Sequence, residues 1–260
     1  MNWKNATENP LLGWFRALGT EFMLSLVGLR YCFSLRFLNF ELRRRLFFFL
    51  CSPWAVSRRF LDQRGEFDAQ GYGETPLITL EAVARRLGIS SDDAVLELGA
   101  GTGRNCVWLS DRYGCRTLGI EQIPLFVQLG KKLARTCMPA GRVSFICGDM
   151  FDLDMSRWQL VYVDCTAMSE SCIRQVAMLC AGLPDGAKVV SVNASFAQLM
   201  PERFQLETAF PGLFIWGWSD MRIQRVGPPE ETPEGQDDLQ DDELLNQLES
   251  HSGRFTATDA

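Results

Sequence analysis

The sequence predicts an α/β fold, in which helices cover both faces of a mostly parallel sheet and a helical segment precedes that sheet. Stretches typical of strands and of helices alternate through residues 66–226, which is the pattern of parallel strands with connecting helices. One apolar stretch runs directly into a glycine-rich turn at 99–103, and a helix-like stretch follows. The 260 residues, of which 47% are apolar and 22% charged, suffice for one domain of this kind with an appended segment.

The predicted elements follow one another in a regular order. Parallel strands are expected at 94–98, 117–120, 143–147, 160–163 and 188–192. Helices are expected at 79–87, 104–111, 123–137 and 171–183. Residues 204–207 and 214–225 are expected to close the sheet as an antiparallel hairpin. The result is a sheet of seven strands.

The two ends of the chain differ in charge. Residues 1–65 carry ten Lys and Arg against four Asp and Glu, whereas residues 227–260 carry one against ten. The basic, aromatic-rich head (1–65) is predicted to form two or three helices, the last beginning at Ser52-Pro53. It could be a cap packed on the 66–226 domain, a surface for peripheral contact with an anionic membrane, or a protein-docking surface. The acidic tail is expected to be disordered, apart from one short helix at 241–248.

The composition argues against several functions. The only histidine, His251, lies in the tail, so we expect neither a histidine-based triad nor a metal site. The nine cysteines include no Cys-x-x-Cys pair, which favours free thiols in the cytoplasm or another reducing compartment. Neither apolar run of the head reaches the roughly 18–20 residues of a membrane span, and no signal peptide is evident. The net charge of -6 alone would suggest no affinity for nucleic acid or anionic lipid, but it averages a basic head with an acidic tail. Direct nucleic-acid binding is not expected.

The segment 95–104 (VLELGAGTGR) is the most informative part of the chain. Its glycines allow a sharp turn and a close approach of ligand to the backbone, so Gly99, Ala100, Gly101 and Gly103 are candidate cofactor contacts. A dinucleotide site would need the spacing G-x-G-x-x-G for a pyrophosphate. Here Glu97 lies two residues before the first glycine, and its carboxylate would repel a pyrophosphate but attract the ammonium group of S-adenosylmethionine (SAM). SAM is therefore favoured over a dinucleotide and over a purely structural turn.

The ends of the next two strands supply further candidates. Glu121 ends the second strand about twenty residues after the loop, where a carboxylate can accept hydrogen bonds from ribose hydroxyls. Asp149 and Met150 follow the third strand, where they would border an adenine. In such a fold the ligand lies at the carboxyl ends of successive strands.

These motifs resemble those of class I SAM-dependent methyltransferases, whose fold is Rossmann-like with seven strands, and the resemblance covers roughly 70–226. A narrower resemblance is to the non-SET lysine methyltransferases of the disruptor-of-telomeric-silencing type, and it rests on the segments 70–76 (QGYGETP), 121–124 (EQIP), 148–151 (GDMF) and 186–191 (GAKVVS). That resemblance implies that Tyr72, Glu74 and Thr75 line the methionine side of SAM, with Gln122 beside Glu121 at the ribose.

The chain departs from that family on the acceptor side. Residues 163–168 (VDCTAM) replace an asparagine-rich stretch, and the acidic tail replaces a basic one, so a nucleosomal substrate is not expected. A protein lysine amine is the preferred acceptor. A small-molecule or lipid amine, or SAM binding without turnover, remains as the alternative.

Four side chains are candidates for catalysis and acceptor binding. Asp164 ends the fourth strand, where it could orient the acceptor, receive its proton, or serve only as a structural cap. Tyr72 is grouped with it as catalytic. Trp216 and Trp218 would share one face if 214–218 formed a strand, and could then hold an alkylammonium group, although aromatic side chains at this spacing are also typical of a core.

Overall fold

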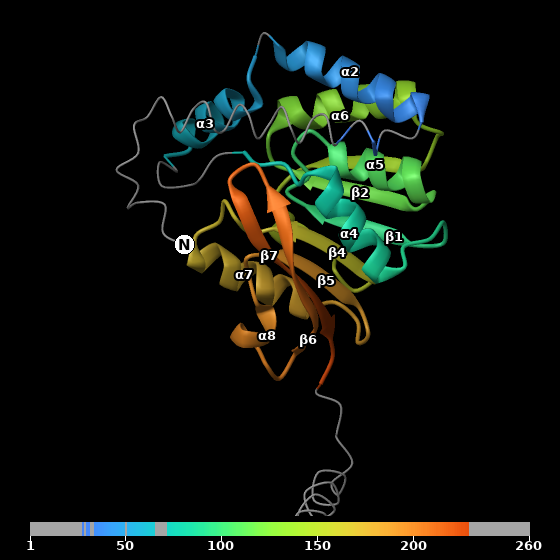
Figure 1. Cartoon of the computed structure of the whole chain (residues 1–260). Coiled ribbons are helices and arrows are strands. Elements are labelled where there is room, and N and C mark those ends of the chain that lie inside the picture. Colours follow the sequence, from blue (N-terminus) through green and yellow to red (C-terminus); the bar gives the residue numbers. More distant parts are fainter. Residues whose placement is uncertain (1–27, 29, 32–33, 50, 66–71, 229–260) are drawn as a thin grey trace, which may run out of the picture. The chain divides into compact units, whose positions relative to one another are not determined.

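The computed structural model describes residues 28, 30–31, 34–49, 51–65 and 72–228. One compact unit extends to Pro228, and the predictions for the tail lie outside the described residues. The elements of this unit surround a single sheet, as Figure 1 shows.

The sheet has seven strands in the order β3-β2-β1-β4-β5-β7-β6. Five of them are parallel: β1 (Ala94–Leu98), β2 (Arg116–Glu121), β3 (Val143–Cys147), β4 (Leu160–Asp164) and β5 (Lys188–Val192). The hairpin of β6 (Phe204–Phe214) and β7 (Gly217–Val226) adds antiparallel strands beside β5. The strand order reverses between β1 and β4, and such a switch point leaves a crevice at the carboxyl ends of these strands. The predicted α/β fold is confirmed.

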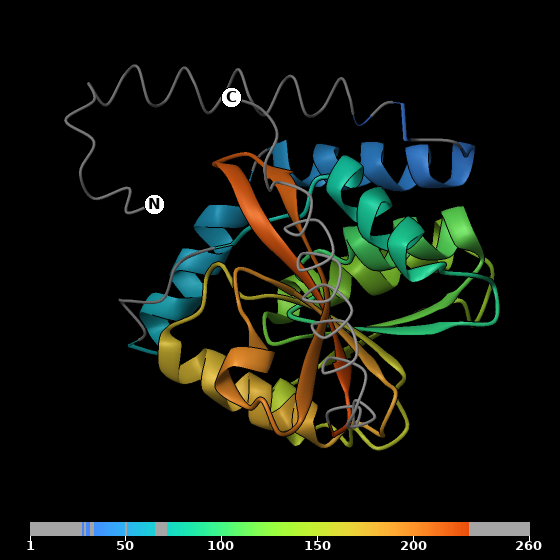
Figure 2. The same cartoon turned by 60° about the horizontal axis from the view of Figure 1, so that its bottom comes forward.

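Helices cover both faces of the sheet (Figures 1 and 2). One face packs against α4 (Leu77–Leu87), α5 (Arg104–Tyr113) and α6 (Pro124–Cys137), and the other against α7 (Glu170–Ala181) and α8 (Phe196–Leu199). The helix ends follow from local sequence. Gly88 and Gly114 end α4 and α5 with positive φ, which costs glycine no steric strain, and Pro124 begins α6, where a missing N–H is tolerated.

The described part of the head forms two helices, α2 (Leu35–Phe49) and α3 (Pro53–Gln63). α2 lies over α5 and α6, and its Phe37 and Phe40 are fully buried in the core on that side of the sheet. α3 begins at Pro53, as the sequence predicts. In the described part of the chain no helix is both long and apolar enough to cross a membrane.

The closing hairpin is present, but the position predicted for its turn was wrong. The expected loop at 208–213 is instead the second half of β6, and the turn consists of Ile215 and Trp216 alone. Pro211 and Gly212 suggest a loop in the sequence, but β6 is the edge strand of the sheet, where proline removes no required hydrogen bond. Residues 214–218 are therefore not one strand, and the condition for placing Trp216 and Trp218 on a common face is not met.

Candidate functional site

The glycine-rich loop after β1 is tightly enclosed. Gly99, Gly101 and Gly103 all have positive φ, a conformation that glycine adopts without strain. A side chain on Gly101 would place its Cβ 2.7 Å from the Tyr72 ring, and one on Gly103 would meet Phe145 at 2.3 Å. The loop therefore needs glycine for its conformation and for its close neighbours.

The segment Tyr72–Thr75 covers this loop. The Tyr72 hydroxyl donates to Glu74 Oε1 and lies 3.1 Å from Thr102 Oγ1. The hydroxyls of Thr75 and Tyr162 are 2.5 Å apart, which ties the segment to β4. Burial, followed by the negative charge of Glu74, raises the pKa of Tyr72 well above its usual value, so the phenol stays neutral.

Glu74 is held by an arginine from α2 that sequence reasoning missed. Arg44 Nη1 donates to Glu74 Oε1 at 2.5 Å, and Arg44 Nε and Nη2 donate to the two carboxylate oxygens of Glu41 at 3.0 and 2.9 Å. Arg104 Nε adds an ion pair with Glu41 at 3.4 Å. Burial raises the pKa of Glu41, but Arg104 and Arg44 outweigh it and hold that pKa well below its usual range. The available signal was the pair Glu41 and Arg44, which lie three residues apart, because Glu41 is the only acidic residue of the predominantly basic helix α2.

Glu97 lies at the end of β1 and points toward α5. Its carboxylate accepts hydrogen bonds from Asn105 Nδ2 at 2.7 Å and from Cys106 Sγ at 3.0 Å. Burial is the main cause that raises the pKa of Glu97 to about 7. Near neutral pH this carboxyl group therefore exchanges between its neutral and its charged form.

Asp164 ends β4 beside the same loop. Its Oδ1 accepts from the backbone N–H and the hydroxyl of Thr166 at 3.0 and 2.7 Å. Its Oδ2 is buried and has no hydrogen-bond partner among the described residues. Burial raises the pKa of Asp164, against the opposing hydrogen bonds from Thr166. An unpartnered buried oxygen at a switch point is suited to bind a ligand.

These side chains line one narrow cavity of about 20 Å³. The cavity wall includes seven residues that the sequence predicted for the site: Tyr72, Glu74, Thr75, Glu97, Gly99, Ala100 and Asp164. Arg104 and Asn105 belong to the same wall and were missed. Four buried polar side-chain atoms of the described residues lack a hydrogen-bond partner, and three of them are in this wall: Arg104 Nε, Asn105 Oδ1 and Asp164 Oδ2.

The remaining predicted residues lie farther along the strand ends. Glu121 is buried, and its two carboxylate oxygens accept from the N–H groups of Gly101 at 2.9 Å and Ile123 at 2.8 Å. Gln122 and Asp149 are exposed, and Met150 is half-buried. Asp149 accepts from the Phe151 N–H at 3.0 Å and so caps the short helix Met150–Asp152.

The two tryptophans of the hairpin have different surroundings. Trp216 stacks on Phe214 with ring centroids 4.9 Å apart, and its ring carbons would be 3.4 Å from a Cβ on Gly73. Its Nε1 donates to Ser219 Oγ at 2.9 Å. Trp218 is 71% exposed. Of these two tryptophans, only Trp216 therefore adjoins the segment Tyr72–Thr75. A third tryptophan, Trp54 of α3, contacts the ring of Tyr72 in the same segment.

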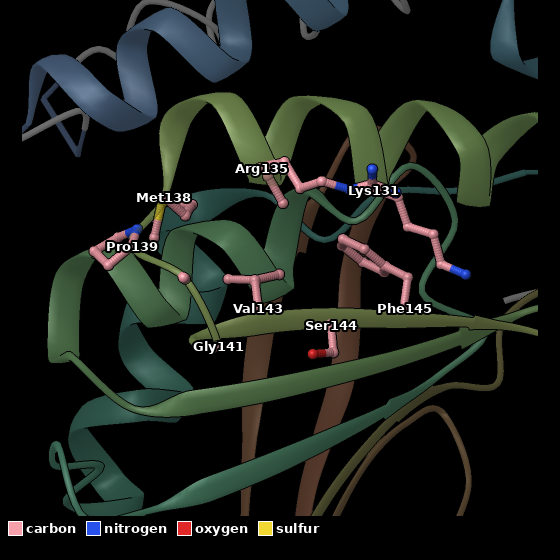
Figure 3. Close-up of a pocket in the computed structure, with 10 residues that line it drawn as sticks. Lys131, Arg135, Met138, Pro139, Gly141, Val143, Ser144 and Phe145 are labelled. Carbon is pink, nitrogen blue, oxygen red and sulfur yellow. The ribbon is translucent and has the colours of Figure 1, made fainter.

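A second hollow, of about 360 Å³, lies between α6 and the edge strand β3 (Figure 3). Lys131 and Arg135 contribute its charges, and it contains none of the predicted site residues. Figure 3 shows Phe145 directed toward α6 and Ser144 directed to the other side of β3. Phe145 is the ring that lies against Gly103, so this hollow adjoins the back of the loop and not the cofactor side.

The polar groups of the cavity wall are chemically complementary to the amino acid end of SAM. That end carries one carboxylate and one ammonium group, which are complementary to the Arg104 guanidinium and to the oxygens of Asn105 and Glu97. Glu121 lies beside Gly101, on the next strand end, where ribose hydroxyls would need acceptors. No group of three or more His, Cys, Asp or Glu side chains in the described part of the chain could hold a metal ion.

Comparisons with known proteins agree with this geometry. A family model described as a methyltransferase domain matches residues 95–204. The sterol 24-C-methyltransferase of Eremothecium gossypii is 32% identical over 72 residues, which are 28% of this chain and only 19% of that protein's length.

Two of the solved structures similar to this chain are methyltransferases, and the first of them supports the same fold. The RNA methyltransferase from Salinibacter ruber, in complex with S-adenosyl-L-homocysteine, is 25% identical with a TM-score of 0.50, over 62% of this chain and 97% of that one. A geranyl diphosphate C-methyltransferase from Streptomyces coelicolor A3(2) is 15% identical with a TM-score of 0.49, over 59% and 77%. The chain therefore contains a SAM-dependent methyltransferase domain of the class I, Rossmann-like fold, and SAM is its cofactor.

Proposed function

We propose that the whole chain transfers methyl groups from SAM to the amine of a protein lysine, as a relative of the non-SET lysine methyltransferases. The observation that carries this proposal is Asp164, whose buried Oδ2 lies in the cavity wall without a hydrogen-bond partner among the described residues. A carboxylate at this point can orient an amine through its N–H groups. The charge of the site is also favourable, because Glu74 and Glu97 line the same cavity.

The acceptor amine must be neutral when it reacts, so the site has to remove a proton. Burial raises the pKa of Asp164, which makes its carboxylate a stronger base than an exposed aspartate. SAM supplies an electrophilic methyl group when bound. Asp164 holds the amine in position and accepts its proton, Arg104 and Glu97 hold the amino acid end of the cofactor, and Tyr72 excludes water as a neutral, buried phenol.

Cofactor binding requires the segment Tyr72–Thr75 to move. The cavity of about 20 Å³ holds about one water molecule, and the Tyr72 ring closes directly over Gly101. Trp54 contacts Tyr72, Trp216 lies beside Gly73, and the two tryptophans are about half exposed, at 40% and 48%. They could contact the methylene chain or the ammonium group of a lysine as it approaches.

A small-molecule amine is the second candidate. The similarity to a sterol 24-C-methyltransferase supports a small-molecule acceptor, but that relative is named for methylation at carbon, so it gives no support for an amine. A lipid amine would fall into the same group of acceptors.

One experiment separates the two. The full chain is incubated with isotope-labelled SAM and a cell extract, which is then fractionated into protein, lipid and small molecules. Label on lysine in a protein band supports the proposal. Label confined to lipid or small molecules overturns the lysine acceptor but keeps the methyltransferase activity.

Asp164→Asn tests the catalytic assignment in the same assay. Because only the proton acceptor is lost, we expect turnover to fall about a hundredfold or more while the Kd for SAM changes little. Asp154→Asn is the matched control, since Asp154 is exposed and lies outside the cavity. Equal turnover of Asp164→Asn and the control would remove Asp164 from catalysis.

A further inference from the structure

The outer face of α2 carries an apolar stripe. Leu35, Leu42, Leu46 and Phe49 are 84%, 59%, 74% and 83% exposed. Their spacing of seven, four and three residues places them on one side of the helix. The buried residues of α2 are Phe37, Phe40, Glu41 and Arg44, so the helix has a second apolar face that the described residues leave uncovered.

Positive charge borders this stripe. Arg36 and Arg43 on α2 are exposed, and α3 adds the exposed Arg58 and Arg59. The only carboxylate of α2 is Glu41, which is buried against Arg44. The exposed surface of α2 is therefore apolar along its centre and basic at its sides, without an acidic group.

We propose that this outer face of α2, together with the adjoining start of α3, binds the surface of an anionic lipid bilayer. Apolar side chains along one helix face can enter the boundary between headgroups and acyl chains, while flanking arginines contact lipid phosphates. Trp54, at the start of α3 and 40% exposed, suits the same interfacial depth. In Figures 1 and 2 α2 is the outermost described helix on its side of the sheet, so a flat surface can reach it.

The binding mode is parallel to the membrane plane. α2 has 15 residues, and no described helix is long and apolar enough to span a bilayer. A helix that lies in the interface gains affinity from both its apolar area and its charge. Each arginine near an anionic surface contributes about a fivefold increase in binding. Charge complementarity is what favours anionic lipid over a neutral bilayer or an apolar protein surface.

The test is co-sedimentation of the full chain with phosphatidylcholine vesicles, with and without phosphatidylserine. We expect binding only when phosphatidylserine is present, and weaker binding at high salt because the charges are then screened. Leu42→Ser/Leu46→Ser should weaken binding by more than about tenfold, since the apolar stripe is interrupted at its centre. Arg36→Gln/Arg43→Gln should weaken it by an order of magnitude or more.

The matched controls replace side chains of the same kinds elsewhere. Met178→Ser/Leu206→Ser removes exposed apolar side chains on α7 and β6, and Arg116→Gln/Arg174→Gln removes exposed charges. Both controls should bind as the unmodified chain does, and circular dichroism should show all variants folded. Absence of binding to phosphatidylserine vesicles, or equal binding by the Leu42 and Leu46 variant, would overturn the proposal. So would a dimer in solution that this variant converts to monomer, because a second copy would then cover the stripe.

Discussion

The two sides of the glycine loop are built differently. At the ends of β1 and β4, the charged groups of Glu97, Arg104 and Asp164 are enclosed, and each has a buried polar atom or a pKa moved by burial. At the ends of β2 and β3, Gln122 and Asp149 are exposed to solvent. Glu121 marks the border between the two sides, because it is buried but bound only by backbone N–H groups.

The difference between the two sides follows from the free-energy cost of burying a charged group. A buried charge needs a partner, since its desolvation costs several kcal/mol. The enclosed side therefore takes Arg44 from α2, 30 residues before Glu74, and so ties the head to the cofactor loop. On the exposed side, water solvates the polar groups of Gln122 and Asp149, so these side chains need no buried ionic partner.

The largest expected effect is on the enclosed side. Arg44→Met removes the cation that pairs with both Glu41 and Glu74. The side chains of these two glutamates are only 7% and 23% exposed, so water cannot fully replace the lost guanidinium. We expect the free energy of unfolding to fall by about 3–5 kcal/mol, measured by urea denaturation. The neighbouring Arg43→Met is the matched control, because Arg43 is exposed and should change stability by no more than about 0.5 kcal/mol. A similar small change for both variants would mean that α2 does not anchor the loop.

The border between the sides is tested by Glu121. Glu121→Ala should weaken SAM binding by about 1–3 kcal/mol in calorimetry, because buried ribose hydroxyls and the Gly101 N–H lose a charged acceptor. Asp149→Ala serves as the exposed comparison and should weaken the same affinity less than Glu121→Ala does, because water can replace an exposed carboxylate as hydrogen-bond partner. If both variants lost the same SAM affinity, the burial of Glu121 would not explain a difference between the two sides of the loop.

Much of the fold could be predicted because its signals are local. Buried parallel strands are largely apolar runs, and the predicted ranges 94–98 and 188–192 coincide with β1 and β5. The hairpin turn could not be predicted, because Pro211 and Gly212 break a strand everywhere except at a sheet edge, and the edge is set by the order of the whole sheet.

The site divides in the same way. Glu97 and the glycines lie in one short motif and Asp164 directly ends a predicted strand, so these residues could be named from sequence, and Glu97, Gly99 and Asp164 line one cavity. Arg44 could not be assigned, since its partner Glu74 lies in another segment and the pairing exists only after α2 packs on α5 and α6. The roles given to the predicted site residues stay predictions.

The last expected effect is a pH dependence that arises from Glu97. Burial raises its pKa to about 7, above the usual value of 4.5, so the folded state holds this proton more tightly than the unfolded chain does. The contribution of Glu97 to stability is therefore fully present below pH 4.5 and is lost as the pH rises through about 7, by roughly 1.4 kcal/mol per pH unit within that window.

SAM binding should depend on pH with the opposite sign. The ammonium group of SAM attracts only the ionised form of Glu97, so affinity should rise about tenfold per pH unit up to about pH 7 and then level off. Glu97→Gln should flatten both curves, the stability curve from denaturation and the affinity curve from calorimetry. If the variant flattens the stability curve alone, Glu97 is a buried structural carboxyl that the cofactor does not contact.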